Sequence, residues 1–408
     1  MANLFNSPAK SAGNLLWFPF FLFLYSFTGN VSNDIYMPSM PVLVNIFNTN
    51  DHLIQMTLAM WFLGDAAPQL LMGPIADRYG RRALLFTGGM TFLLATFICA
   101  ISSHIGYLII ARFFQGVGVC SLTIVGFVVI HELFQGHQCV RLLSFLTVFN
   151  SAAPLLGPLI GGYVFLLLGW RANFVIVLVL GLVGILGLWK LMPESKTNLD
   201  YTALQPKVLL NNYISLFKNR LFMCHLIAYG LFFGGIIAYL SGAPFVIIKQ
   251  LGIPAQYFGL TQLFIFGAFI LTSLLVGKFV KRYSNRSIIL TGSILIVFAA
   301  VLMLIMSLCF PQNLYGFVGA MMLYAAGFGL AGSPLAKETL SASPHWGGFS
   351  AAMLGFSMTG FSSLGSFVVS VVYNQTIFSV AVVILVMTVV ALLVCSLAGN
   401  KVKIRTEL

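Results

Sequence analysis

Long apolar stretches recur along the whole chain, and each is long enough to cross a lipid bilayer. A helical span needs about 20 mostly apolar residues. Breaks at charge clusters, prolines and polar turns give twelve such stretches: 15–36, 53–73, 83–103, 105–131, 141–168, 172–191, 221–245, 256–279, 287–309, 314–337, 348–373 and 377–398. Only 7% of the residues are charged, whereas soluble domains carry about 25%. The sequence therefore predicts an all-α polytopic membrane protein with twelve transmembrane helices.

A polar segment and an internal repeat divide the chain into two halves. Residues 193–220 form the only long interior segment without a span, so we expect a six-helix bundle in 1–192, a cytoplasmic linker, and a second bundle with a short cytoplasmic tail in 221–408. The basic stretch 73–82, GPIADRYGRR, has a near-copy at 277–286, GKFVKRYSNR. Each is predicted as a turn between corresponding spans, which indicates two pseudo-symmetric six-helix bundles.

The distribution of lysine and arginine predicts the orientation of the chain. Most of the 21 basic residues fall in alternate loops, whereas Arg171 and Lys249 are the exceptions and Arg112 lies inside a span. Basic loops stay on the cytoplasmic side, so both termini are expected in the cytoplasm, with the protein in a bacterial cytoplasmic membrane. Topology accounts for the net charge of +12, and nucleic acid is not expected as a partner.

Cysteine and histidine spacing gives no sign of a disulfide framework, a metal site or an enzyme. The six cysteines are scattered through apolar stretches, and the six histidines lie mostly at span ends on both sides. No G-x-x-x-x-G-K-[S/T] loop is present to hold a nucleotide. No cofactor is therefore expected.

Four motifs carry a resemblance to a known family. The stretch 73–82 resembles the signature loop of the major facilitator superfamily, and 154–162, PLLGPLIGG, resembles its antiporter motif. Residues 112–116 resemble its buried-arginine motif, and Asn33-Asp34 lies in the first span. Together they resemble proton-coupled drug efflux antiporters of the Bcr/MdfA type. The resemblance implies export of small lipophilic or cationic compounds by a monomer driven by a proton gradient.

The resemblance assigns two groups of residues to conformational change. The first group would be a latch that holds the outward-open state, and the alternative is a positively charged loop that only sets topology. The residues of this group are Gly73, Asp77, Arg78, Gly80, Arg81 and Arg82. The acid of this group is expected to cap a helix or to pair with arginines across the gap between the halves. The second group would seal the cavity by close helix packing, and the alternative is an ordinary small-residue packing face. The residues of this group are Pro154, Gly157, Pro158, Gly161 and Gly162.

Ionisable groups inside spans are rare and are functional by default. Counting along the span puts Asp34 toward the outer leaflet, or at the mouth or upper wall of a cavity if its helix continues to Pro38. Its carboxyl would hold either a proton or a cationic cargo, as the resemblance also implies, and the alternative is a merely interfacial residue. Arg112 would lie near this acid and tune its proton affinity, or act as a structural hub. Asp65 would add a titratable group, or only bond a neighbouring helix. Glu132 is expected at a surface or gate.

The remaining predicted site residues would line the substrate cavity. They are Asn33, Tyr25, Ser26, Gln115 and Asn150. Ser26 stands where relatives of this subgroup can carry a second carboxylate, and a hydroxyl does not exchange a proton near neutral pH. Export of an endogenous metabolite or siderophore, and uptake of a nutrient by proton symport, stay open as alternatives, although the motif at 154–162 favours antiport over symport.

Overall fold

All regular structure in the described part of the chain is helical. The computed structural model describes residues 12–196, 198–343 and 347–405. The helices of the first half are α1 (Ala12–Asp34), η2 (Met37–Ser39), α2 (Met40–Ile46), α3 (Asp51–Ala66), α4 (Gln69–Tyr79), α5 (Arg81–Ile101), α6 (Ile105–Leu133), α7 (Gly136–Leu168) and α8 (Trp170–Leu191). Those that follow are α9 (Pro206–Lys218), α10 (Arg220–Pro244), η3 (Phe245–Gln250), α11 (Ala255–Phe279), α12 (Asn285–Cys309), α13 (Leu314–Ser341), α14 (Gly347–Val372) and α15 (Ile377–Arg405).

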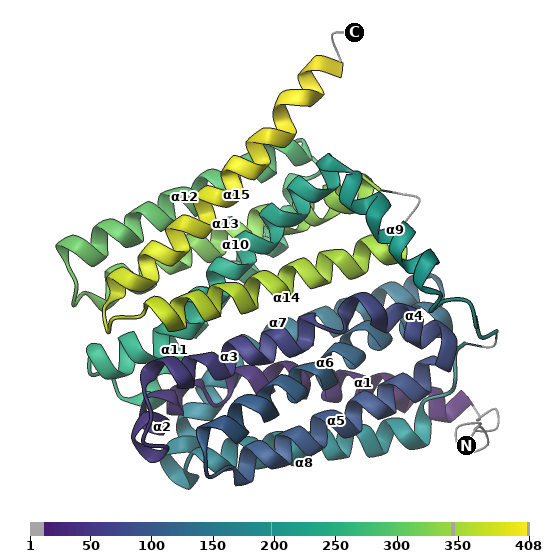
Figure 1. The fold of residues 1–408 in the computed structure, drawn as a ribbon, viewed down its shortest axis with the longest axis horizontal. Helices are drawn as coiled ribbons and strands as arrows, with labels where there is room; N and C mark the ends of the chain where they lie inside the picture. Colours follow the sequence, from purple (N-terminus) through teal and green to yellow (C-terminus); the bar gives the residue numbers. More distant parts are fainter. Residues whose placement is uncertain (1–11, 197, 344–346, 406–408) are drawn as a thin grey trace.

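The helices form two stacked bundles whose long axes run roughly parallel (Figure 1). Helices α1–α8 make one bundle and α10–α15 the other, while α9 crosses between them at the right-hand end of the view, here called the α9 end. The opposite end of the two bundles, where helix α2 lies, is called the α2 end. The bundles meet where α3 packs along α14 and α7 packs along α11. By the internal repeat, α3–α4 corresponds to α11 and α7 corresponds to α14. The pseudo-symmetry therefore exchanges the two contacts, as a duplication requires.

Ten helices of the described residues are long and apolar enough to cross a membrane. The other two predicted spans are α1, with 23 residues, and the broken pair α3–α4. A 23-residue helix is about 35 Å long, enough for the hydrocarbon core of about 30 Å. The all-α fold of twelve membrane helices in two six-helix bundles is therefore confirmed.

The second span differs from its prediction because it is broken at Pro68. Helix α3 ends at Ala66, and α4 begins at Gln69 and continues to Tyr79, beyond the expected end at residue 73. Proline has no backbone N–H to continue the helical ladder. The amides of Leu71 and Met72 instead bond to the carbonyl of Pro68. Most of the predicted basic turn is consequently helix, and the chain reverses only at Gly80, whose φ is 92°.

Two further helical segments lie where the sequence predicted none. Short helices η2 and α2 fill the connection between the first two spans, and α9 lies inside the linker 193–220. Tyr213 of α9 donates a hydrogen bond of 2.6 Å to the carbonyl of Leu70, and its ring packs against Phe349. The linker is thus docked on both bundles.

Candidate functional site

Arg112 is the centre of a buried polar network near the α2 end. It lies on α6 with no exposed surface. Its Nη1 donates to the carbonyl of Ser32 at 3.0 Å and to Gln115 Oε1, and its Nη2 donates to Asn33 Oδ1 at 2.9 Å. The guanidinium also lies over the ring of Tyr36, 4.6 Å from its centroid. A buried arginine stays charged, so these neutral acceptors hold a full positive charge inside the first bundle.

Asp34 joins this network through its neighbour. Asn33 Nδ2 donates to Asp34 Oδ1 at 3.0 Å, so the asparagine bridges Arg112 to the carboxylate. Asp34 is the last residue of α1 and is 6% exposed. The helix does not continue to Pro38, so of the two alternatives the residue lies toward the α2 end, as counting along the span suggested. The proximity of Arg112 to the first-span acid is confirmed, although Asn33 stands between them.

Helix α7 encloses Asp34 from the other side. A Cβ atom added at Gly157 would lie 2.9 Å from the Asp34 Cβ, and one at Gly161 would lie 1.7 Å from the backbone oxygen of Ile35. A Cβ at Gly162 would meet the Ala255 oxygen of α11 at 2.8 Å. The glycines therefore permit close backbone contact with α1 on one face and with the second bundle on another. Pro154 and Pro158 lie within the same continuous helix.

A second polar patch lies between α1 and α7, closer to the α9 end. Ser26 Oγ donates to Asn150 Oδ1 at 2.7 Å, and Asn30 Nδ2 approaches the same oxygen at 3.3 Å. Ser26, Asn30 and Asp34 follow one another at intervals of four, so they share one face of α1. This stripe is about 12 Å long at 1.5 Å per residue. Asn30 was missed by the sequence analysis, although the spacing of four was visible.

Two other predicted residues lie away from this patch. Tyr25 points into the first bundle, where it packs against Gly184 of α8 and meets the ring of Phe92 edge-on. The structure does not bring it to Asn150. Gln115 instead belongs to the arginine network, since its Nε2 donates to Thr96 Oγ1 at 2.8 Å. Ser26 and Asn150 are thus the two predicted cavity residues that meet directly.

Asp65 lies in the contact between α3 and α6. It is 7% exposed, and its Oδ1 is buried without a hydrogen-bond partner among the described residues. A Cβ added at Gly116 of α6 would meet the Asp65 amide at 2.8 Å, which shows how closely the two helices approach. The carboxyl also stands three residues before the break at Pro68. It is therefore a buried carboxyl beside a helix discontinuity, on the helix that packs along α14.

The charged residues at the junction of α4 and α5 form one cluster at the α9 end. Arg81 Nη2 lies 2.9 Å from Asp77 and 3.1 Å from Glu132. Lys196 Nζ lies 3.0 Å from the same Asp77 oxygen. Glu194 accepts from the backbone amides of Arg81, at 2.9 Å, and of the next residue, at 3.0 Å. Glu132, expected at a surface or gate, is thus an ion-pair partner in this cluster.

Two expectations for this cluster need correction. Asp77 neither caps a helix amino terminus nor pairs across the gap between the bundles, because its partners lie in the first bundle and the linker. The cap of α5 is Glu194, which the sequence analysis missed. A cap supplied from 113 residues away leaves no local signal. Arg82 donates to the carbonyl of Trp189 at 2.7 Å, while Arg78 lies over the ring of Tyr79.

The bundles are joined at both ends by other polar contacts. At the α2 end, Lys249 Nζ lies 2.7 Å from Asp51 Oδ1. Toward the α9 end, Thr359 Oγ1 donates to Gln69 Oε1 at 3.0 Å, and between them Ser363 Oγ donates to the Ala59 carbonyl at 2.9 Å. Helix α7 is mostly exposed from residue 136 to 149. Its contact with α11 is therefore limited to the part near the α2 end.

Two six-helix bundles with buried ionisable side chains near their junction define a membrane transporter. Buried charges of this kind mark ion and substrate pathways in membrane proteins. The described architecture contains the two related halves that alternating access uses.

Comparison with known proteins agrees with this class. The model of the Major Facilitator Superfamily matches residues 22–365. Multidrug transporter MdfA of Edwardsiella piscicida is 30% identical over 359 residues, which cover 88% of this chain and 87% of that protein. MdfA of Escherichia coli O157:H7 is 29% identical over 355 residues, 87% and 86% of the two chains.

A solved structure shares the fold. The partially occluded inward-open xylose transporter XylE from E. coli superposes with a TM-score of 0.71 at 16% identity, over 94% of this chain and 97% of that one. The chain belongs to the major facilitator superfamily and, within it, to the MdfA-like transporters. It is an integral membrane protein that handles small molecules.

Proposed function

We propose that this protein is a proton-coupled antiporter that exports small lipophilic or cationic compounds. The placement of Asp34, between the Arg112 network and the glycines of α7, carries this proposal. Curated relatives named multidrug transporters support the cargo class. The basic loops support an orientation with the α9 end and both termini in the cytoplasm, and the bacterial relatives support a bacterial cytoplasmic membrane. The protein acts as a monomer and needs no cofactor beyond the proton gradient.

The coupling step takes place at the Asp34 carboxyl. When a proton binds, it neutralises the Asp34 carboxylate, which lies beside Asn33 and Arg112. When the proton leaves, the positive charge of a cationic cargo compensates the carboxylate instead. The two ligands therefore bind alternately, which is the requirement for antiport. Ser26, Asn30 and Asn150 extend the polar surface along α1 and α7 and form the cargo side of the site.

The conformational step follows from the contacts of α7. Protonation changes the charge at a residue whose Cβ touches Gly157, and five residues further on Gly162 touches α11 of the other bundle. A small movement of the end of α1 is thus transmitted to the junction between the bundles. The cluster of Asp77, Arg81 and Lys196 fixes the break between α4 and α5 and acts as the latch at the cytoplasmic end.

Asp65 is proposed as the second proton-carrying residue. Its unpartnered Oδ1 lies on the helix that packs along α14, so its charge bears on the other contact between the bundles. This placement supplies a carboxyl that position 26 lacks. Comparison of Asp65→Asn with Asp34→Asn in the same transport assay tests whether Asp65 carries a proton.

Transport into proteoliposomes with an imposed pH gradient tests the function. We expect the wild type to move a fluorescent lipophilic cation against the proton flow, and Asp34→Asn to abolish this coupled movement while inserting normally. Asp200→Asn is the matched control, because Asp200 lies exposed in the linker. Transport by Asp34→Asn that still responds to the pH gradient would refute the proposed coupling site.

A further inference from the structure

A cavity of about 620 Å³ lies inside the second bundle at the α9 end. It lies between α10, α12, α13 and α15 and is partly open, away from the junction between the bundles. Its lining residues are Leu221, His225, Arg286, Ile289, Leu290, Ser293, Leu335, Glu338, Leu392, Cys395 and Ser396. The proposed antiport uses none of them.

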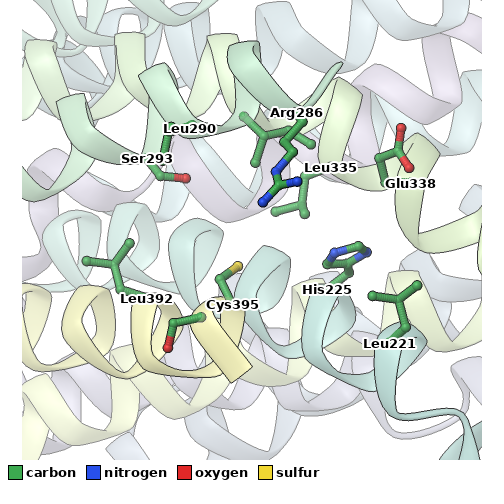
Figure 2. Close-up of a pocket in the computed structure, with 11 residues that line it drawn as sticks. Leu221, His225, Arg286, Leu290, Ser293, Leu335, Glu338, Leu392 and Cys395 are labelled. Atoms are coloured by element: carbon green, nitrogen blue, oxygen red, sulfur yellow. The ribbon is translucent and has the colours of Figure 1, made fainter. Parts of the chain in front are cut away.

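The charged side chains and His225 lie at one end of the lining, while leucine and serine side chains occur along the rest of it. Arg286 is the second residue of α12, and Glu338 lies in the last turn of α13, so both charges stand near the α9 end. Leu290 and Leu392 lie one turn or more deeper in the bilayer. Figure 2 shows the Arg286 guanidinium pointing into the cavity toward His225, with the leucines along the walls. The cavity is thus shaped for a molecule with a polar head and an apolar tail.

The internal repeat shows what the first bundle places at the corresponding position. Arg82 and Arg286 occupy the same position of the two basic stretches. Arg82 is 4% exposed, donates to the Trp189 carbonyl, and lies beside the carboxylate of Glu194. In the first bundle, therefore, an acidic residue that follows α8 provides the anionic partner.

Among the residues that the structure describes after α13, the second bundle has no such acid. After Glu338 the next acidic residue of the sequence is Glu407, and α15 continues as helix to Arg405 where α8 ends at Leu191. Glu338 itself accepts a hydrogen bond of 2.8 Å from Asn285, just as Glu132 pairs with Arg81 in the first bundle. Within the described part of the chain, Arg286 therefore has no carboxylate partner equivalent to the one that Glu194 gives to Arg82.

Ser396 donates to the carbonyl of Leu393 at 2.8 Å, but the Arg286 guanidinium and the Nδ1 of His225 have no partner among the residues that the structure describes. No hydrogen bond or ion pair joins Arg286 to any of them, and the Nδ1 of His225 is buried without a partner. A guanidinium carries five donors in a planar fork that matches two oxygens of a phosphate. Basic pockets between membrane helices on the cytoplasmic side bind anionic lipid headgroups. The charge and the apolar walls together therefore fit one class of ligand.

We propose that this cavity binds an anionic glycerophospholipid of the cytoplasmic leaflet. The phosphate accepts hydrogen bonds from Arg286 and His225 and takes the place that the Glu194 carboxylate fills in the first bundle. An acyl chain lies along Leu290 and Leu392. The lipid thereby completes the second half of the internal repeat.

Native mass spectrometry of the delipidated full-length protein tests this site. Phosphatidylglycerol and phosphatidylethanolamine are titrated separately, and the affinity for the first bound lipid is measured. We expect Arg286→Gln to lower the phosphatidylglycerol affinity at least about tenfold, because charge-assisted hydrogen bonds are lost. Arg282→Gln is the matched control, since this exposed arginine of the preceding turn lies outside the cavity and should retain the wild-type affinity.

A second variant keeps the charges and reduces the volume. Leu290→Trp should lower the phosphatidylglycerol affinity as well, so the test does not depend on the folding of Arg286→Gln alone. Equal affinity of the wild type and both variants would overturn the proposal. So would equal binding of phosphatidylethanolamine, or full displacement by millimolar glycerol phosphate, which would show that a free anion satisfies the site.

Discussion

Replacement of Gly161 by alanine tests the contact between α7 and the end of α1. The added Cβ would lie 1.7 Å from the backbone oxygen of Ile35, whereas real Cβ contacts are essentially never shorter than 3.0 Å. The two helices must therefore separate by at least about 1.3 Å, because no side-chain rotation can relieve a clash with backbone. This separation moves Asp34, the residue next to Ile35, away from Gly157.

The size of the effect follows from two opposing terms. Alanine gains about 1 kcal/mol over glycine in a helix interior, whereas overpacking costs about 1–3 kcal/mol. We expect Gly161→Ala to be destabilised by up to about 2 kcal/mol and to lose proton-coupled transport by at least about tenfold, since displacement of reacting groups by about 1 Å is costly. Thermal unfolding in detergent and transport in proteoliposomes measure the two effects.

Gly267→Ala is the matched control, because a Cβ at Gly267 of α11 meets nothing within 4 Å. This variant should be as stable as the wild type or more stable, since only the helix-propensity gain of about 1 kcal/mol applies. If Gly161→Ala matched Gly267→Ala in both unfolding temperature and transport rate, the close contact of α7 with α1 would have no bearing on coupling.

Three further substitutions probe other parts of the account. Glu194→Gln removes the charge that caps α5 and should lower stability by about 1 kcal/mol, whereas Asp200→Asn should not; equal unfolding temperatures would contradict the capping role. Lys249→Ala removes the partner of Asp51 across the bundles, and because Lys249 is partly exposed the cost should stay below about 1 kcal/mol. A cysteine introduced near the α2 end should be labelled faster in this variant, and unchanged labelling would show that the ion pair does not hold the bundles together there. Asp65→Asn should weaken the response of cation efflux to the pH gradient while cation binding persists; a full response would leave Asp65 outside the coupling mechanism.

The sequence predicted the parts of this fold that depend on the bilayer. A membrane accepts only long apolar helices whose backbone groups are bonded internally, so the length of each apolar stretch was enough to locate the spans. The break at Pro68 was not predicted, although proline removes a helical donor. Prolines 154 and 158 occur inside an unbroken helix, so packing around each proline decides whether the helix ends.

The site was predictable in its residue types and not in its pairings. Arg112 and Asp34 stood out because charges inside apolar spans are rare. Asn33 links these two residues, and Ser26 bonds to Asn150 across 124 residues of sequence. Both contacts depend on how the helices pack, which a local sequence pattern does not predict. The four-residue spacing of Ser26, Asn30 and Asp34 was the one local signal that remained unused.

The most direct test of alternate occupancy at Asp34 is proton release on cargo binding. The purified protein in weakly buffered detergent solution at neutral pH is mixed with a lipophilic cation, and the released protons are counted with a pH indicator. The account predicts release by the wild type and by Asp200→Asn, and none by Asp34→Asn. Tight binding of the cation by the wild type with no proton released would contradict it.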